Sequence, residues 1–137
     1  MRSLVVLALI VVALATFVLS HKYDDITRLQ VGVKYRPVEC KVQVEQGDSI
    51  DVHYEGKTTD GNEFDSSVKR GTPFTFRVGQ GSVIQGWDTG LLGACEGEKR
   101  KLVIPSHMGY GERGSPPKIP ANAVLIFDVE VVKINKK

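Results

Sequence analysis

The residues best suited to do chemistry surround the only tryptophan of the chain. Trp87 lies in the run 83–93, where Ile84 and Leu91 fall on its own face of a short helix. Another face carries three glycines: Gly86, Gly90 and Gly93. Glycine inside a helix costs about 1 kcal/mol relative to alanine, so these positions predict either close packing against the helix or that little helix is needed. A large ring on such a thin helix could form the floor of an apolar pocket. From this segment alone, a plain core role for Trp87 is the alternative.

No pattern for covalent, phosphate or metal chemistry accompanies this ring. Residues 109–114 match GxGxxG, but Pro116 and Pro117 follow and exclude the helix that a dinucleotide site requires. The sequence has no GxSxG elbow, and nothing groups its carboxylates. The three histidines lack metal-ligand spacing: His21, His53 and His107. We therefore expect neither a metal nor a cofactor.

An apolar pocket lined by rings suits a reaction without covalent steps. Rotation about a peptide bond faces a barrier of ~18–20 kcal/mol, because twisting destroys amide resonance. The planar amide is more charge-separated than the twisted one, so a dry apolar pocket favours the twisted transition state. Bonds that precede proline are the natural substrates, since their cis and trans forms differ by only about 1 kcal/mol.

The elements that could hold such a pocket are strands in which apolar and polar residues alternate. Period-two patterns run over five segments: 31–35, 50–54, 74–78, 102–104 and 125–131. Strands of this kind are typical of antiparallel sheets with one face on a core, and only 84–92 has a helical pattern. The prediction is an α+β domain, an antiparallel β-sheet wrapped over one short α-helix. The proline-rich stretch 106–123 has neither pattern and is expected to be a stiff functional loop.

Five short segments follow one another along this framework. They are Val52-His53-Tyr54-Glu55-Gly56, Phe64-Asp65-Ser66-Ser67, Val83-Ile84-Gln85-Gly86-Trp87, Tyr110-Gly111 and Ile126-Phe127-Asp128-Val129-Glu130. In this order they closely resemble the FKBP family of peptidyl-prolyl cis-trans isomerases, over residues 31 to 134. The loop sequence at 111–120 is most similar to the small endoplasmic-reticulum members. The resemblance implies an FKBP-like fold, rotamase activity on X-Pro bonds during protein folding, and binding of tacrolimus- and rapamycin-type macrolides.

The same resemblance implies roles for individual residues. Trp87 would be the floor under the substrate proline, Asp65 a carboxylate near the substrate carbonyl, and Tyr110 a hydroxyl donor. The catalytic set is Tyr54, Phe64, Asp65, Trp87, Tyr110 and Phe127. The substrate- and macrolide-binding set is Arg70, Phe74, Val83, Ile84 and Ile119, the last as the loop-side lip. Ser115 and Lys118 depart from the common cytosolic pattern at the loop rim, which bears on peptide preference. A binding module that holds proline-containing clients without turnover is the alternative function.

The first twenty residues predict a secretory signal peptide, cut after Ser20. Arg2 precedes the apolar run 4–19, whose 16 residues fall short of the ~20 needed to cross a bilayer, so a membrane span is the weaker alternative. We expect a flexible segment over 21–30 and one isomerase domain over 31–137. The mature chain is expected to be a monomer that is not bound to the membrane. We expect it in the endoplasmic reticulum lumen or secreted, and both remain open because no KDEL-type tail is present.

Charge and cysteine content narrow the partners and the compartment. Without residues 1–20 the chain carries 17 Lys+Arg and 16 Asp+Glu, which argues against nucleic acid. The basic clusters 99–101 and 136–137 are expected to be solvated. In an oxidising compartment, Cys40 and Cys95 predict one structural disulfide, with two free buried thiols as the alternative. The resemblance to the small endoplasmic-reticulum FKBP implies the same bond.

Overall fold

The computed structural model describes residues 22–23 and 25–137; the predicted signal peptide lies outside the described residues. The elements are β1 (Gln30–Tyr35), β2 (Ser49–Thr58), β3 (Glu63–Ser66), α2 (Ser67–Arg70), β4 (Phe74–Arg77), α3 (Gln85–Gly90), β5 (Lys99–Ile104), the 3-10 helix η1 (Ser106–Met108) and β6 (Leu125–Asn135). The predicted α+β class is confirmed. Within the described ranges, no helix is long and apolar enough to span a membrane.

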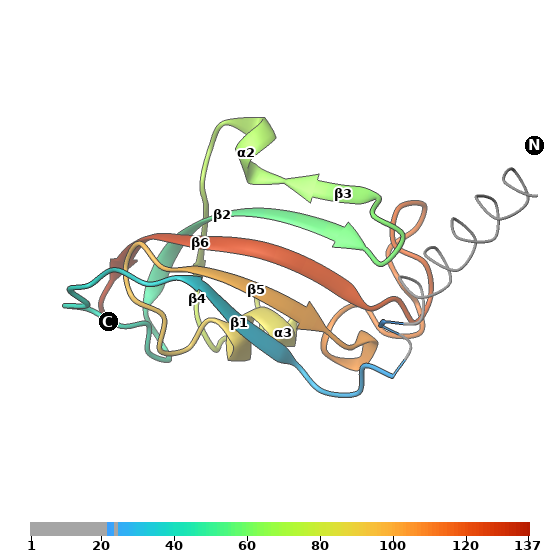
Figure 1. Cartoon of the computed structure of the whole chain (residues 1–137), viewed down its shortest axis with the longest axis horizontal. Helices are drawn as coiled ribbons and strands as arrows, with labels where there is room; N and C mark the ends of the chain where they lie inside the picture. The colour runs from blue at the N-terminus through green and yellow to red at the C-terminus, as the bar shows by residue number, and fades with distance from the viewer. Residues whose placement is uncertain (1–21, 24) are drawn as a thin grey trace, which may run out of the picture.

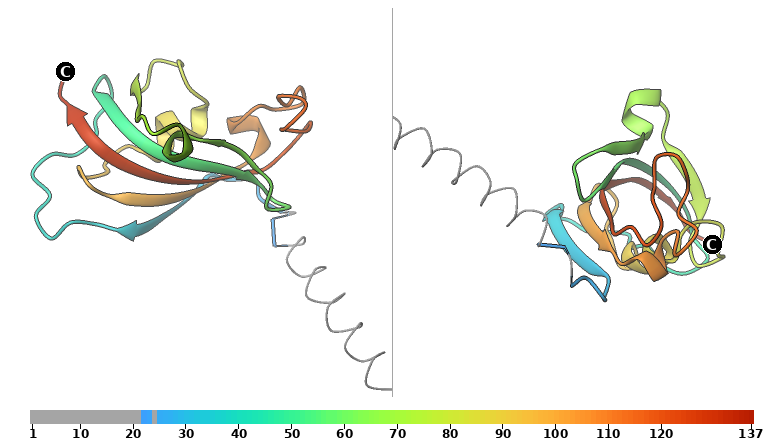
Figure 2. Two further views of the ribbon diagram at one scale, coloured as in Figure 1. Left: turned by 90° about the horizontal axis from the view of Figure 1, so that it is seen from above. Right: turned by 90° about the vertical axis from the view of Figure 1, so that its right-hand side faces the viewer.

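One antiparallel sheet organises the molecule, in the order β1-β5-β6-β2-β3, with β4 also paired to β2. The long strands β2 and β6 form its centre and pair from Thr58↔Leu125 to Ser49↔Asn135. The sheet is curved, and α3 lies against its concave face (Figures 1 and 2). Strand β2 alternates as predicted, with Ile50, Val52 and Tyr54 buried on the side of this helix.

The glycines of α3 let the helix approach β5 closely. A Cβ atom at Gly86 would lie 2.6 Å from the side chain of Ile104, and one at Gly90 would lie 3.0 Å from Leu102. Trp87, between them, is only 4% exposed. The close packing predicted from the glycine spacing is therefore confirmed at Gly86 and Gly90, whereas Gly93 lies beyond the helix at a φ of +78° and has no close neighbour. The helix is shorter than the predicted 84–92, because Leu91 already caps its C-terminal end.

Strand β1 forms where it was predicted, but its apolar side chains are not in the core. Val31, Val33 and Tyr35 are 44%, 50% and 55% exposed. The reason is position: β1 is an edge strand that pairs with β5 alone. Alternation indicates a strand with two unlike faces, and it cannot tell whether another layer covers the apolar face.

Three short elements were not predicted. Strand β3 and helix α2 each contain a single apolar residue, Phe64 and Val68, so neither shows a period. Ser66 caps α2 by accepting a hydrogen bond from the Lys69 N–H, and Gly71 ends it at a φ of 75°. Helix η1 lies within the stretch 106–123, which was expected to have no regular structure.

The expectation that both basic clusters are solvated was wrong at Arg100, whereas Lys136 is exposed as predicted. Arg100 is buried beside Glu98, which is fully buried, and its guanidinium donates to the carbonyls of Gly90 and Leu92, each at 2.9 Å. Lys136 donates to the buried carboxylate of Asp48 at 2.6 Å. A buried carboxylate is costly without a partner, which explains why Arg100 leaves the solvent and why the exposed Lys136 directs its ammonium group to Asp48.

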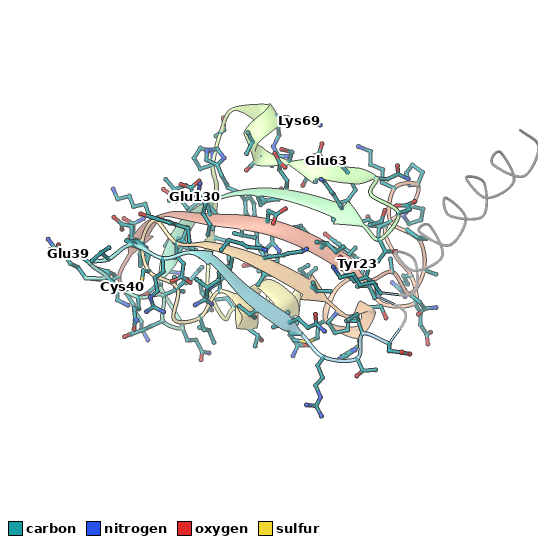
Figure 3. All side chains as sticks on the ribbon, viewed as in Figure 1. Tyr23, Glu39, Cys40, Glu63, Lys69 and Glu130 are labelled. Carbon is teal, nitrogen blue, oxygen red and sulfur yellow. A yellow bond between two sulfur atoms is a disulfide. The ribbon has the colours of Figure 1, made fainter. Side chains whose placement is uncertain are left out.

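Cys40 and Cys95 form a disulfide, which confirms the predicted pairing. The bond ties the segment after β1 to the chain that follows α3, across a sequence separation of 55 residues. Figure 3 places Cys40 near one end of the sheet, at the opposite end from Tyr23. Cys95 is fully buried, so the link reaches into the core.

Candidate functional site

The candidate site is a cavity of about 270 Å³ above Trp87. It is lined by side chains from β2, β3, β4, α3, β6 and the loops before α3 and after η1. The lining residues are Tyr54, Phe64, Asp65, Phe74, Ser82, Val83, Ile84, Trp87, Tyr110 and Phe127. Residues far apart in the sequence thus meet in one hollow, which is mostly aromatic and aliphatic.

Aromatic rings stand edge-on around the tryptophan. The ring centroids of Tyr54 and Phe127 lie 4.8 Å and 5.2 Å from that of Trp87, with interplanar angles of 76° and 82°. Such edge-to-face pairs contribute about 0.5–1.5 kcal/mol each beyond their buried area. The indole nitrogen of Trp87 is buried and has no hydrogen-bond partner among the described residues. Trp87 therefore contributes to the site chiefly as an apolar surface.

Gly56 allows two of the walls to meet. A Cβ atom at this position would lie 2.6 Å from the ring of Phe127 and 2.7 Å from that of Phe64. These two rings pack edge-to-face with centroids 5.4 Å apart. Any larger residue at position 56 would displace at least one of them from its place in the cavity wall.

A polar network forms one edge of the cavity. The Tyr54 hydroxyl donates to Oδ2 of Asp65 at 2.5 Å, and Nη2 of Arg70 donates to that hydroxyl at 2.9 Å. Arg70 also donates from Nη1 to Oδ1 of Asp65. Partial burial would raise the pKa of the Asp65 carboxyl, but the bonds from Tyr54 and Arg70 outweigh it and hold the pKa below its ordinary value. Asp65 is therefore a carboxylate at neutral pH.

The two tyrosines of the site remain protonated. Burial raises the pKa of the Tyr54 hydroxyl, and its bond to Asp65 raises it further. Burial and the negative charge of Asp65 likewise raise the pKa of Tyr110. Tyr110 is 43% exposed at the cavity wall. Its hydroxyl is thus available as a neutral hydrogen-bond donor.

The structure brings together nine of the eleven site residues predicted from the sequence. Arg70 lies beside the cavity, through its bonds to Tyr54 and Asp65. Ile119 is only 5% exposed and packs in the core instead of lining the cavity. Lys118, expected at the rim, lines a different cavity together with Tyr23 and Asp60.

Sequence reasoning missed Ser82, which lines the cavity just before Val83. A single serine in a glycine-rich turn carries no pattern of its own, and only its place before the recognised segment could have indicated it. Within residues 22–23 and 25–137, no three His, Cys, Asp or Glu side chains group as a metal site.

Comparison with known proteins gives consistent matches. Residues 40–132 match the family described as "FKBP-type peptidyl-prolyl cis-trans isomerase". Peptidyl-prolyl cis-trans isomerase FKBP15-2 of Arabidopsis thaliana is 59% identical over 86% of this chain and 72% of its own length. Peptidyl-prolyl cis-trans isomerase FKBP2 of Homo sapiens is 52% identical over 99% of this chain and 94% of its own length. The solved structure titled "Crystal structure of AtFKBP13" matches with a TM-score of 0.70 and 38% identity, over 80% of this chain and 93% of that one.

Proposed function

This chain belongs to the FKBP-type peptidyl-prolyl cis-trans isomerases, and we propose that it accelerates X-Pro isomerisation in proteins that fold in the secretory pathway. Isomerase activity itself follows from the family. The secretory assignment rests on the predicted signal peptide over residues 1–20 and on the disulfide between Cys40 and Cys95, which suits an oxidising compartment. The mature enzyme is then a single domain over 31–137, in the endoplasmic reticulum lumen or secreted, and acts as a monomer.

The observation that carries the mechanism is the apolar cavity over Trp87. The substrate proline ring sits on the indole, between Tyr54 and Phe127, and displaces water from the cavity. In this surrounding the charge-separated planar amide loses stabilisation, while the twisted amide does not, so the barrier to rotation falls. No bond to the enzyme forms, and no proton is transferred.

The polar edge of the cavity orients the substrate. Tyr110 donates a hydrogen bond to a substrate carbonyl, since its hydroxyl stays protonated. Asp65 is held in place by Tyr54 and Arg70, and its fixed negative charge lies beside the carbonyl carbon of the twisting amide. A preorganised charge costs no reorganisation during the reaction.

Macrolide binding is part of the same proposal. A cavity of about 270 Å³ with aromatic walls and one or two polar anchors is suited to a cyclic amide of the tacrolimus type. The proposed contacts are Trp87 under the ring of the ligand and Phe74, Val83 and Ile84 along its sides. Tacrolimus should therefore compete with proline peptides.

The test is a protease-coupled prolyl-peptide assay with and without tacrolimus. Trp87→Leu removes the flat floor but keeps an apolar side chain, so kcat/KM and tacrolimus affinity should both fall at least tenfold while circular dichroism stays native. Val132→Ala, at an exposed position on β6, is the matched control and should change neither. Tacrolimus binding with no measurable turnover in the parent protein would favour the binding-module alternative. Wild-type turnover and affinity in the leucine variant would remove Trp87 from the site.

The secretory assignment has its own experiment. Expression of the full chain in a eukaryotic cell, followed by mass determination of the mature protein, should show an N-terminus at His21 and no free thiol. An unprocessed chain in the cytosol would contradict the location while leaving the isomerase activity intact.

A further inference from the structure

The loop between β4 and α3 supplies one wall of the cavity. Ser82, Val83 and Ile84 line the cavity from this loop. Loops are the parts of a fold that move most easily, since few of their backbone groups are paired. A wall that must exclude water therefore requires something that fixes the loop relative to the floor.

Asp88 is the side chain that makes this connection. Its Oδ1 accepts a hydrogen bond from the N–H of Gly79 at 2.9 Å, and its Oδ2 accepts one from the N–H of Gly81 at 3.1 Å. Both bonds go to a carboxylate, and such charge-assisted bonds are about twice as strong as neutral ones. Asp88 follows Trp87 directly on α3, so it joins the loop to the same helix that carries the floor.

The conformation of the loop suits this contact. Gly79 and Gly81 have φ values of +81° and +70°, a region that other residues rarely adopt. A Cβ atom at Gly79 would lie 2.6 Å from the side chain of Gln46, so the turn is also closely packed on its other side. The two amides are thereby held with their N–H groups toward one carboxylate.

We propose that Asp88 is a positioning residue of the cavity, which holds the wall Ser82–Ile84 at a fixed distance from Trp87. The inference rests on the proposed function of this cavity. Without the carboxylate the wall can move outward and water can enter beside the proline ring. Both substrate binding and the desolvation that lowers the barrier then weaken, so the loss is seen in kcat/KM and in part in KM.

Two variants and one control test the inference. Asp88→Ala removes both acceptors, while Asp88→Asn keeps the shape and one acceptor oxygen. Asp128→Ala removes an exposed carboxylate on β6 that lines no part of the cavity over Trp87. The readouts are kcat and KM for a proline peptide, and hydrogen exchange of the Gly79 and Gly81 amides by NMR.

We expect kcat/KM to fall roughly tenfold in Asp88→Ala, less in Asp88→Asn, and not at all in Asp128→Ala, with KM raised in the alanine variant. Exchange at Gly79 and Gly81 should accelerate at least tenfold in Asp88→Ala, while the β2 amides stay protected. Wild-type kinetics in a folded alanine variant would overturn the inference, and so would a loss of activity with unchanged exchange at both glycines. If Asp88→Ala does not fold, the same criteria apply to Asp88→Asn. Failure of the proposed function is distinguishable, because it requires an inactive parent protein or an unaffected Trp87→Leu variant.

Discussion

Removal of the disulfide should destabilise the domain without impairing catalysis. The bond closes a loop between residues 55 positions apart. In the chain-entropy model, a cross-link of this length lowers the entropy of the unfolded chain by about 14 cal/mol/K, which corresponds to about 4 kcal/mol at 25 °C. For a domain of this size, that change is equivalent to a melting temperature lower by roughly 15 °C. Neither cysteine lines the cavity over Trp87, so the site should keep its shape.

The assay compares the parent protein with the double variant Cys40→Ala/Cys95→Ala. Both are unfolded with urea, and Trp87 fluorescence monitors the transition. We expect a lower free energy of unfolding and a larger m value, because the unfolded chain without the cross-link exposes more surface. Prolyl-peptide turnover in the absence of urea should stay within twofold. Addition of a reductant should reproduce the effect in the parent and change nothing in the double variant.

Two results would refute this reasoning. A free energy of unfolding within about 1 kcal/mol of the parent value would show that loop closure does not govern the stability. A folded double variant with strongly reduced turnover would show that the bond shapes the cavity, despite its separation from it.

Three further variants or conditions test the site itself. Gly56→Ala should lose about 1–3 kcal/mol of stability and much of the tacrolimus affinity, measured by thermal unfolding and titration, because its methyl group meets the rings of Phe64 and Phe127. Tyr110→Phe should weaken tacrolimus binding by about 0.5–1.5 kcal/mol, the contribution of one neutral hydrogen bond; a thousandfold loss in an intact fold would require another role for the hydroxyl. Turnover should be nearly constant between pH 6 and 8. Asp65 has a lowered pKa, so its network is complete above the unfolded value of about 3.9 and is lost only as the pH falls through the still lower folded value. A steep change near neutral pH that maps to His53 would contradict a mechanism without proton transfer.

Alternation predicted most of the sheet because its centre has one buried and one solvated face. Strand β2 shows this in full, with every second residue from Ile50 to Thr58 buried. The same rule gave the wrong environment for Val31 and Val33, since burial at a sheet edge depends on what lies above it. Charge patterning failed at Arg100 for a related reason: Glu98, two positions earlier, is fully buried on the same side of the chain, and burial of that pair depends on the packing around it.

The candidate site could be predicted only in part. Resemblance to the family indicated the aromatic residues, because they occur in segments with distinctive neighbours. It did not indicate Ser82, which reaches the cavity only because of the turn before α3. It also did not indicate Asp88, whose carboxylate accepts hydrogen bonds from the backbone of that turn. It also placed Ile119 at the rim, although hydrogen bonds between the backbones of Ser115 and Ile119 fold this part of the loop back toward the core.

The pairing of β2 with β6 has a consequence for how the chain is made. The partners lie between 67 positions apart (Thr58 and Leu125) and 86 positions apart (Ser49 and Asn135). During synthesis at about 5–20 residues per second, β2 therefore waits several seconds before its main partner exists. Over that time the backbone N–H and C=O groups along the edge of β2 that later pairs with β6 have no partner strand. Long-range pairing of this kind also makes folding slow once the chain is complete. Until β6 has been made, this edge of β2 is therefore open to pairing with other chains.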